Sequence, residues 1–251
     1  MRIGLPILLC LFIGVLAQAE DYPKFIKPDE HVCAARLADH HEQMINNWMK
    51  TNRNFETTCK LYVDPRFRED VNALGPDDQW MDSGSGEGLT LADYQKWGKA
   101  RTLGVVIELP KGTKKVSTAR HRILDKRYIE EIPPEEIGET ALVTDGMGPT
   151  AYAFHFHEII NLYLKVVKNG GVIWLALDNE DTKIHTKDAG TLSLAHYLKL
   201  RLKGHNVDLF GPNDNVMRIQ LTEKGPRQLK SLTWKVFATA NPPYREYTEA
   251  D

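Results

Sequence analysis

The chain has 251 residues, of which 42% are hydrophobic, 26% charged and 9% aromatic, and its formal net charge at pH 7 is -2. These values exclude a wholly disordered, collagen-like or coiled-coil protein. The length is sufficient for one large domain with an extensive core. Because 32 basic residues face 34 acidic ones, overall positive charge gives no reason to expect a nucleic-acid partner.

The first 19 residues have the pattern of a secretory signal peptide. Arg2 supplies a positive charge, residues 3–16 form an uncharged apolar run, and Ala17-Gln18-Ala19 is a small-residue cleavage site. We therefore expect residues 1–19 to be removed, leaving an exported, periplasmic or secreted protein that begins at Glu20. The run is shorter than the roughly 20 residues of a membrane span, which disfavours the alternative of an uncleaved anchor.

Two cysteines remain after that cleavage, Cys33 and Cys59. In an oxidising compartment such a pair predicts a disulfide, and two buried free thiols are the alternative. Both lie within residues 20–77, where a Pro- and Lys-containing arm precedes helical spacing over residues 31–61. We expect residues 20–77 to form an N-terminal arm and a helical extension.

From about residue 78 the pattern alternates between strands and helices, which predicts a parallel α/β sheet within one domain, residues 78–251. The expected strands are residues 79–81, 103–109, 141–144, 172–177 and a late pair, 216–221 and 232–239, that resembles a hairpin. The expected helices are residues 91–100, 151–168, which Asn169-Gly170-Gly171 should stop, and 192–203.

A glycine-rich turn, Asp82-Ser83-Gly84-Ser85-Gly86-Glu87-Gly88, follows the first of these strands. Alternate glycines let the backbone approach a ligand closely, and such turns lie at the carboxyl edge of a parallel sheet, where ligands bind. The spacing fits neither the dinucleotide fingerprint nor the P-loop. Because Asp82 and Glu87 would repel a phosphate, the turn favours a cationic ligand without phosphate.

Glu108 ends the next expected strand, about twenty residues after the turn. A carboxylate at this position can accept hydrogen bonds from both hydroxyls of a ribose. The turn and this acid together predict a site for a ligand that contains adenosine.

The segment Asp82-x-Gly84-x-Gly86-x-Gly88 resembles the first motif of the class I S-adenosylmethionine-dependent methyltransferases, and Glu108 resembles their ribose-binding acid. Asp145 and Asn169-Gly170-Gly171 also fall where that family has corresponding features. The resemblance covers about residues 78–178. It implies a Rossmann-like fold whose mostly parallel seven-stranded sheet has helices on both faces and an antiparallel last strand, and it implies S-adenosylmethionine as the cofactor.

The resemblance also assigns roles to single residues. Asp82 would help to bind the ammonium group, and the glycines would pass close to the methionine part of the cofactor. The family's adenine-binding acid has no clear counterpart in Arg127-Tyr128-Ile129-Glu130, so Tyr128 or Ile129 is expected to pack on the adenine. The implied cofactor-binding residues are Asp82, Gly84, Ser85, Gly86, Gly88, Glu108, Tyr128 and Asp145.

The implied reaction is displacement at the sulfonium methyl by an acceptor bound near residues 145–152. The acceptor would be a small molecule or an envelope-associated compound. Asp145 and His155 are the candidate catalytic residues, the latter because an imidazole can act as a general base. His155 and His157 would diverge on a helix, so we expect no joint metal site from them.

Three other interpretations remain. The primary expectation is a site without a metal ion. In one alternative, the protein resembles the cation-dependent O-methyltransferases, whose metal ligands would correspond to Asp145, Asp178 and Asn179 and would suit magnesium or calcium. A binding or interaction module without catalysis is a second alternative. Asn241-Pro242-Pro243-Tyr244 resembles the signature of amino-group methyltransferases, but its place near the end of the chain indicates a turn.

Overall fold

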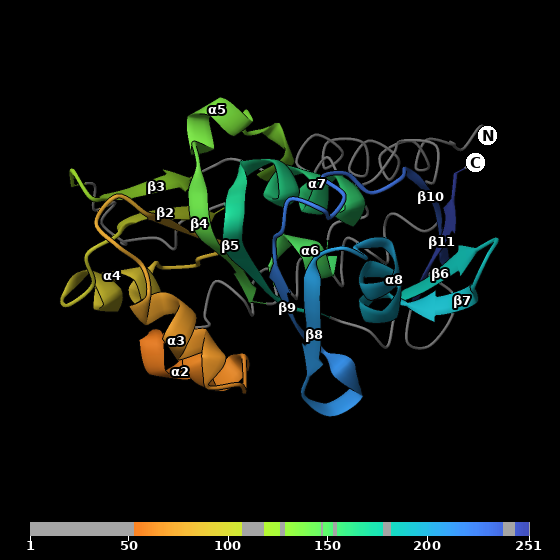
Figure 1. Ribbon diagram of the computed structural model, residues 1–251, viewed down its shortest axis with the longest axis horizontal. Coiled ribbons are helices and arrows are strands. Elements are labelled where there is room, and N and C mark those ends of the chain that lie inside the picture. The colour runs from red at the N-terminus through yellow and green to blue at the C-terminus, as the bar shows by residue number, and fades with distance from the viewer. Residues whose placement is uncertain are drawn as a thin grey trace, which may run out of the picture.

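The computed structural model (Figure 1) describes residues 53–106, 118–125, 129–146, 148–152, 155–177, 182–237 and 244–250. The expected signal peptide lies outside these residues, as do Cys33, Glu108, Tyr128, Asp178 and Asn179. Within the described ranges, no helix has the length and apolar character needed to cross a membrane.

Seven strands form the main sheet, in the order β3-β2-β1-β4-β5-β9-β8. Their bounds are β1 Gln79–Ser83, β2 Arg101–Val106, β3 His121–Asp125, β4 Thr140–Gly146, β5 Val167–Ala176, β8 Asn206–Phe210 and β9 Val216–Gln220. The strands from β3 to β5 are parallel, whereas β9 is antiparallel to both β5 and β8. This order, with its antiparallel β9, is that of the class I methyltransferase fold and confirms the expected fold class.

Helices cover both faces of this sheet. Their bounds are α2 Phe55–Leu61, α3 Arg66–Asn72, α4 Leu89–Gln95, α5 Pro134–Ile137, α6 Pro149–Tyr152, α7 Phe156–Val166 and α8 Leu194–Arg201. Successive strand residues point to opposite faces, so Trp80 and Trp174 enter a core with α2, α3 and α4, while Met81 and Ile173 enter a second core with α7 and α8.

The helices before β1 are an integral layer of the fold rather than an appendage. Phe67 of α3 lies between two buried tryptophans, its ring centroid 6.3 Å from that of Trp80 and 5.8 Å from that of Trp174. Tyr62 packs 4.6 Å from Phe67 and is fully buried. α2 and α3 therefore help to bury both tryptophans on this face of the sheet.

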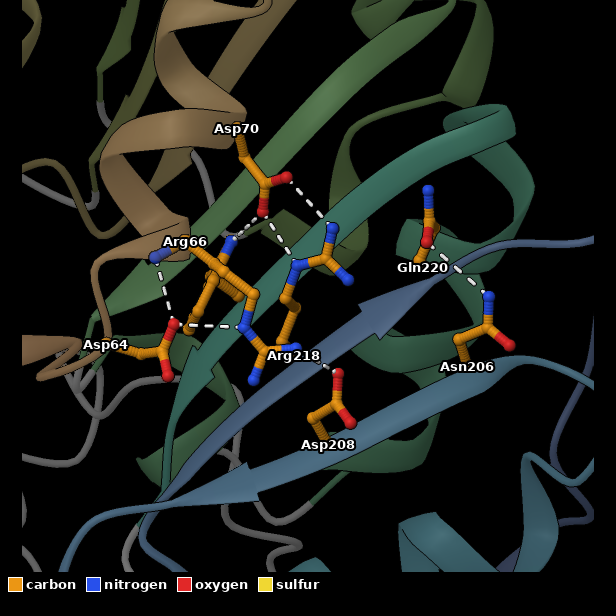
Figure 2. A network of polar contacts seen from close by, with 8 residues as sticks. Asp64, Arg66, Asp70, Asn206, Asp208, Arg218 and Gln220 are labelled. Atoms are coloured by element: carbon orange, nitrogen blue, oxygen red, sulfur yellow. Dashed lines mark hydrogen bonds and ion pairs between the residues drawn. The ribbon is translucent and has the colours of Figure 1, made fainter.

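A polar contact fixes α3 to the far half of the sheet (Figure 2). Asp70 accepts hydrogen bonds from Nε and Nη2 of Arg218 on β9, at 2.8 and 2.9 Å. It also accepts one from Nε1 of Trp174, at 2.8 Å. The Arg218 and Asp70 side chains are only 10% and 16% exposed, so this pair is largely shielded from solvent.

The structure corrects the expected end of the helix after β4. The expected helix is replaced by two, α6 over Pro149–Tyr152 and α7 over Phe156–Val166, and β5 begins at Val167, directly after α7. Asn169-Gly170-Gly171 therefore lies inside β5, where Thr140 pairs with Val167 but Leu142 pairs with Val172. The intervening residues form a bulge in which Gly170 has a φ of 78°. The glycines serve this bulge instead of stopping a helix.

The expected hairpin of the two late strands is wrong, because they belong to different sheets. β9 joins the main sheet, whereas β10 lies in a second sheet of order β10-β11-β6-β7. The strands of this second sheet are β6 Thr182–Thr186, β7 Gly190–Ser193, β10 Leu232–Phe237 and β11 Tyr244–Glu249. Figure 1 shows α8 between β8 of the main sheet and the β6–β7 edge of the second.

Candidate cofactor site

The glycine-rich turn joins β1 to α4 at the carboxyl edge of the main sheet. Gly84, Gly86 and Gly88 have φ angles of 79°, 54° and 73°, in the left-handed region that favours glycine. The backbone N–H groups of Gly84 and Ser85 donate to the carbonyl oxygen of Val105, at 2.9 and 3.1 Å. The turn is therefore anchored to the end of β2.

The loop after β4 packs directly against this turn. A Cβ atom on Gly84 would lie 2.9 Å from Cα of Gly148 and 3.2 Å from Cδ of Pro149. A Cβ atom on Gly148 would lie 2.6 Å from the carbonyl oxygen of Ser83. Because β2 and β4 flank β1 on opposite sides, these two loops meet at the point where the strand order reverses, which is where open α/β sheets bind ligands.

Asp82 lies below the turn and is 8% exposed. Its Oδ1 accepts a hydrogen bond of 2.7 Å from the Thr144 hydroxyl, which in turn accepts one of 2.9 Å from Nε1 of Trp80. Burial raises the pKa of Asp82 to about 6, although the Thr144 hydrogen bond and the nearby Arg53 oppose this rise. At neutral pH the site therefore holds a carboxylate that a bound cation would stabilise.

Arg53 is a site residue that the sequence interpretation missed. Its Nη1 donates to the carbonyl oxygen of Gly146 at the end of β4, and its charge lowers the pKa of Asp82. A Cβ on Gly146 would meet Leu61, Arg53 and Tyr62 within 3.2 Å, so the start of the described chain covers this end of β4. Arg53 lies outside the motif region, and no pattern in the sequence identified it.

Asp145 is fully buried and its carboxylate is saturated with hydrogen bonds. It accepts from the backbone N–H groups of Gly148 and Thr150, at 2.8 and 2.9 Å, from the Thr150 hydroxyl, and from the Tyr163 hydroxyl at 2.9 Å. Burial nevertheless raises its pKa. The geometry makes Asp145 a support for the loop that packs on Gly84, with three of the four hydrogen bonds on Oδ2 and one on Oδ1. The catalytic, cofactor-binding and metal-binding roles considered for this residue stay predictions.

The expected divergence of His155 and His157 is wrong. His155 is the N-cap of α7, with φ -96° and ψ 40°, so only His157 lies within the helix. The two imidazole rings therefore approach each other, with 6.1 Å between their centroids, and both lie beside Glu158. Burial lowers the pKa of His157.

The remaining predicted positions are described only in part. Ser85 lies in the turn, as expected, whereas Glu108 and Tyr128 lie outside the described residues. Cys59 on α2 is half-buried and forms no disulfide with any other residue that the structure describes. Its expected partner, Cys33, is not among those residues, so the disulfide stays a prediction.

Comparisons with known proteins give distant structural likenesses. No family model and no curated protein matches the sequence. One similar solved structure is a candidate haemolysin from Streptococcus thermophilus, with 12% sequence identity over 70% of each chain and a TM-score of 0.42. A second is a candidate methyltransferase from Haloferax volcanii in complex with its Trm112 activator, with 14% identity over 70% of this chain and 97% of that one and a TM-score of 0.44. A third is a candidate S-adenosylmethionine-dependent methyltransferase from Listeria monocytogenes, with 13% identity over 61% of this chain and 95% of that one and a TM-score of 0.42. These likenesses are too weak to carry an argument, so the fold assignment rests on the order and direction of the strands.

Proposed function

We propose that this protein is an exported methyltransferase that binds S-adenosylmethionine in the turn between β1 and α4. The observation that carries the proposal is the buried Asp82 carboxylate directly below the left-handed turn Gly84–Gly88, at the reversal point of a class I methyltransferase sheet. A cationic ligand that contains no phosphate matches this charge, and S-adenosylmethionine carries both an ammonium and a sulfonium group.

Asp82 and Arg53 together suit the zwitterionic end of this cofactor. The α-ammonium group of a methionine moiety requires an anionic partner, and its α-carboxylate requires a cationic one. Asp82 supplies the first and Arg53 the second, since Arg53 is close enough to lower the pKa of Asp82. In this proposal the Arg53 guanidinium turns from the Gly146 carbonyl to the cofactor carboxylate on binding.

The methyl acceptor is a small molecule or an envelope-associated compound that reaches the loop after β4, between residues 145 and 152. Methyl transfer then requires mainly that the acceptor atom, the methyl group and the sulfur atom be held in line, which is worth up to about 7–11 kcal/mol of the barrier. Two alternatives come from the same sequence: a binding module that lacks catalysis, and a cation-dependent O-methyltransferase that uses Asp145, Asp178 and Asn179.

Calorimetric titration with S-adenosylmethionine and S-adenosylhomocysteine in EDTA separates both enzymes from the binding module, and a methyl-transfer assay with and without EDTA separates the two enzymes from each other. The proposed enzyme binds both ligands in EDTA and loses binding in the Glu108→Ala variant. A binding module that has lost the cofactor site gives no heat with either ligand, although the protein is folded by circular dichroism. A cation-dependent enzyme binds the cofactor but transfers no methyl group in EDTA.

A further inference from the structure

The start of α7 brings together two histidines and a glutamate outside the candidate cofactor site. His155, His157 and Glu158 each offer one ligand atom, and these three atoms all lie within 4.8 Å of one another. Nδ1 of His155 is 3.8 Å from Oε1 of Glu158, and Nε2 of His157 is 3.9 Å from the same oxygen. Both distances are longer than the donor–acceptor distance of a hydrogen bond. The three side chains therefore lie close together without hydrogen bonds to each other.

The buried histidine of this group lacks a partner. The His157 side chain is 6% exposed, and its Nδ1 is buried with no hydrogen-bond partner. The two ring nitrogens of an imidazole point in different directions, and the one that faces Glu158 is Nε2 rather than this Nδ1. Nε2 is therefore the atom that the buried His157 offers to the cluster.

We propose that His155, His157 and Glu158 bind a divalent first-row transition metal ion, with zinc the best match. Two imidazoles and one carboxylate are a ligand set that zinc takes in open sites, at about 2.0–2.2 Å from the metal. Ligand atoms around a tetrahedral ion at these distances lie about 3.3–3.5 Å apart. The observed separations of 3.8 and 3.9 Å need only small side-chain rotations to reach that spacing.

The ion has access to this cluster from solvent. The Glu158 side chain is 56% exposed and that of His155 is 26% exposed, whereas His157 closes the inner side. Three protein ligands leave a fourth position for water or for an oxygen atom of a substrate, which the metal would polarise. The cluster follows α6 on the same edge of the sheet as the glycine-rich turn, but it shares no residue with that turn. Metal binding at this cluster is therefore independent of cofactor binding.

The test is titration of the metal-stripped full chain with Zn²⁺ by calorimetry, and with Co²⁺ by visible absorption. We expect one equivalent to bind. The exposed position of Glu158 makes Glu158→Gln an informative variant that preserves side-chain size, and His155→Ala removes a ligand outside the helix. Each should weaken binding at least tenfold, because each deletes one of three protein ligands.

His196 provides the matched control. It is also a histidine beside a carboxylate, with Nε2 3.5 Å from Asp214, but it is 56% exposed and no third ligand accompanies it in the part of the chain that the structure describes. The proposal requires unchanged affinity in His196→Ala and in Cys59→Ser. It is overturned if the wild-type chain binds no Zn²⁺, if Glu158→Gln and His155→Ala bind as tightly as wild type, or if Cys59→Ser abolishes binding.

Discussion

At the scale of single residues, the burial of the Asp82 carboxylate destabilises the fold and prepares this group to bind a cationic ligand. The carboxyl group has one short hydrogen bond, from Thr144, in a site where burial raises its pKa to about 6. Asp145 is even more deeply buried but has four hydrogen-bond donors. The contrast indicates that Asp145 stabilises a loop, whereas Asp82 retains the capacity to bind a cation.

Asp82 should therefore make the free energy of unfolding depend on pH. Its folded pKa of about 6 lies above the usual value of 3.8, so its contribution to stability is complete below pH 3.8 and is lost as the pH rises through 6. Urea unfolding at several pH values should show the Asp82→Asn variant gaining stability relative to wild type by about 2 kcal/mol between pH 4 and pH 7. A difference between the two proteins that stays constant with pH would contradict this assignment.

The sequence identified Asp82 and the glycines because they belong to one contiguous motif whose spacing has a local physical reason. Arg53 and Thr144 could not be found in this way. Thr144 meets Asp82 only because β4 pairs with β1, and Arg53 reaches Gly146 only because α2 and α3 pack on the sheet. His155 was misjudged because the exact start of α7 decides whether its ring points toward His157 or away from it.

At the scale of elements, the turn after β1 and the loop after β4 depend on each other. Gly84 and Gly138 have the same φ of 79°, but a Cβ atom on Gly138 would have no neighbour within 4 Å. Gly138, with φ 79° and ψ 178°, lies in a region that is populated almost only by glycine, so Gly138→Ala should cost only backbone strain, about 1–3 kcal/mol. Gly84→Ala should cost about 1–3 kcal/mol more, because its Cβ also clashes with Gly148. Equal losses in urea unfolding would show that the two loops do not pack as described.

The ion pair between α3 and β9 permits a second test. Asp70→Ala leaves the Arg218 guanidinium buried without a partner, which should lower the free energy of unfolding by about 3–5 kcal/mol. Adding Arg218→Met should restore much of this loss, since the double variant has no unpaired charge. Glu56→Ala, which removes the exposed partner of Arg68, should give no measurable change. A double variant no more stable than Asp70→Ala would contradict this explanation.

The parallel strands could be predicted because buried apolar runs and helix periodicity are local signals. The second sheet could not, since β11 pairs with β6 across more than sixty residues of chain and no nearby turn marks that pairing. The bulge in β5 was missed for a related reason. An Asn-Gly-Gly sequence fits both a helix end and a bulge, and only the pairing of Val167 with Thr140 and of Val172 with Leu142 decides between them.

At the scale of the whole molecule, export is a prediction from residues 1–19 that the described part of the chain does not test. Intact-mass measurement of the protein from its native host should give a chain that begins at Glu20. The same measurement before and after reduction should show the two-hydrogen difference of one disulfide between Cys33 and Cys59. A chain that retains Met1, or one that carries two free thiols, would contradict the corresponding part of this prediction.

The fold and the buried carboxylate together indicate that a cation binds at Asp82, below the glycine-rich turn. The most direct test is the affinity for S-adenosylmethionine at pH 7.5 and at pH 5, measured by calorimetry. Protonation of Asp82 at pH 5, one unit below its pKa of about 6, should weaken wild-type binding about tenfold.

Two matched variants complete this measurement. Asp82→Asn should bind weakly at both pH values, whereas Asp77→Asn, which alters an exposed aspartate before the opposite end of β1, should behave like wild type. Tight wild-type binding at pH 7.5 that weakens at pH 5 only when Asp82 is present would support the account. Binding that is absent in folded protein, or that Asp82→Asn leaves unchanged, would contradict it.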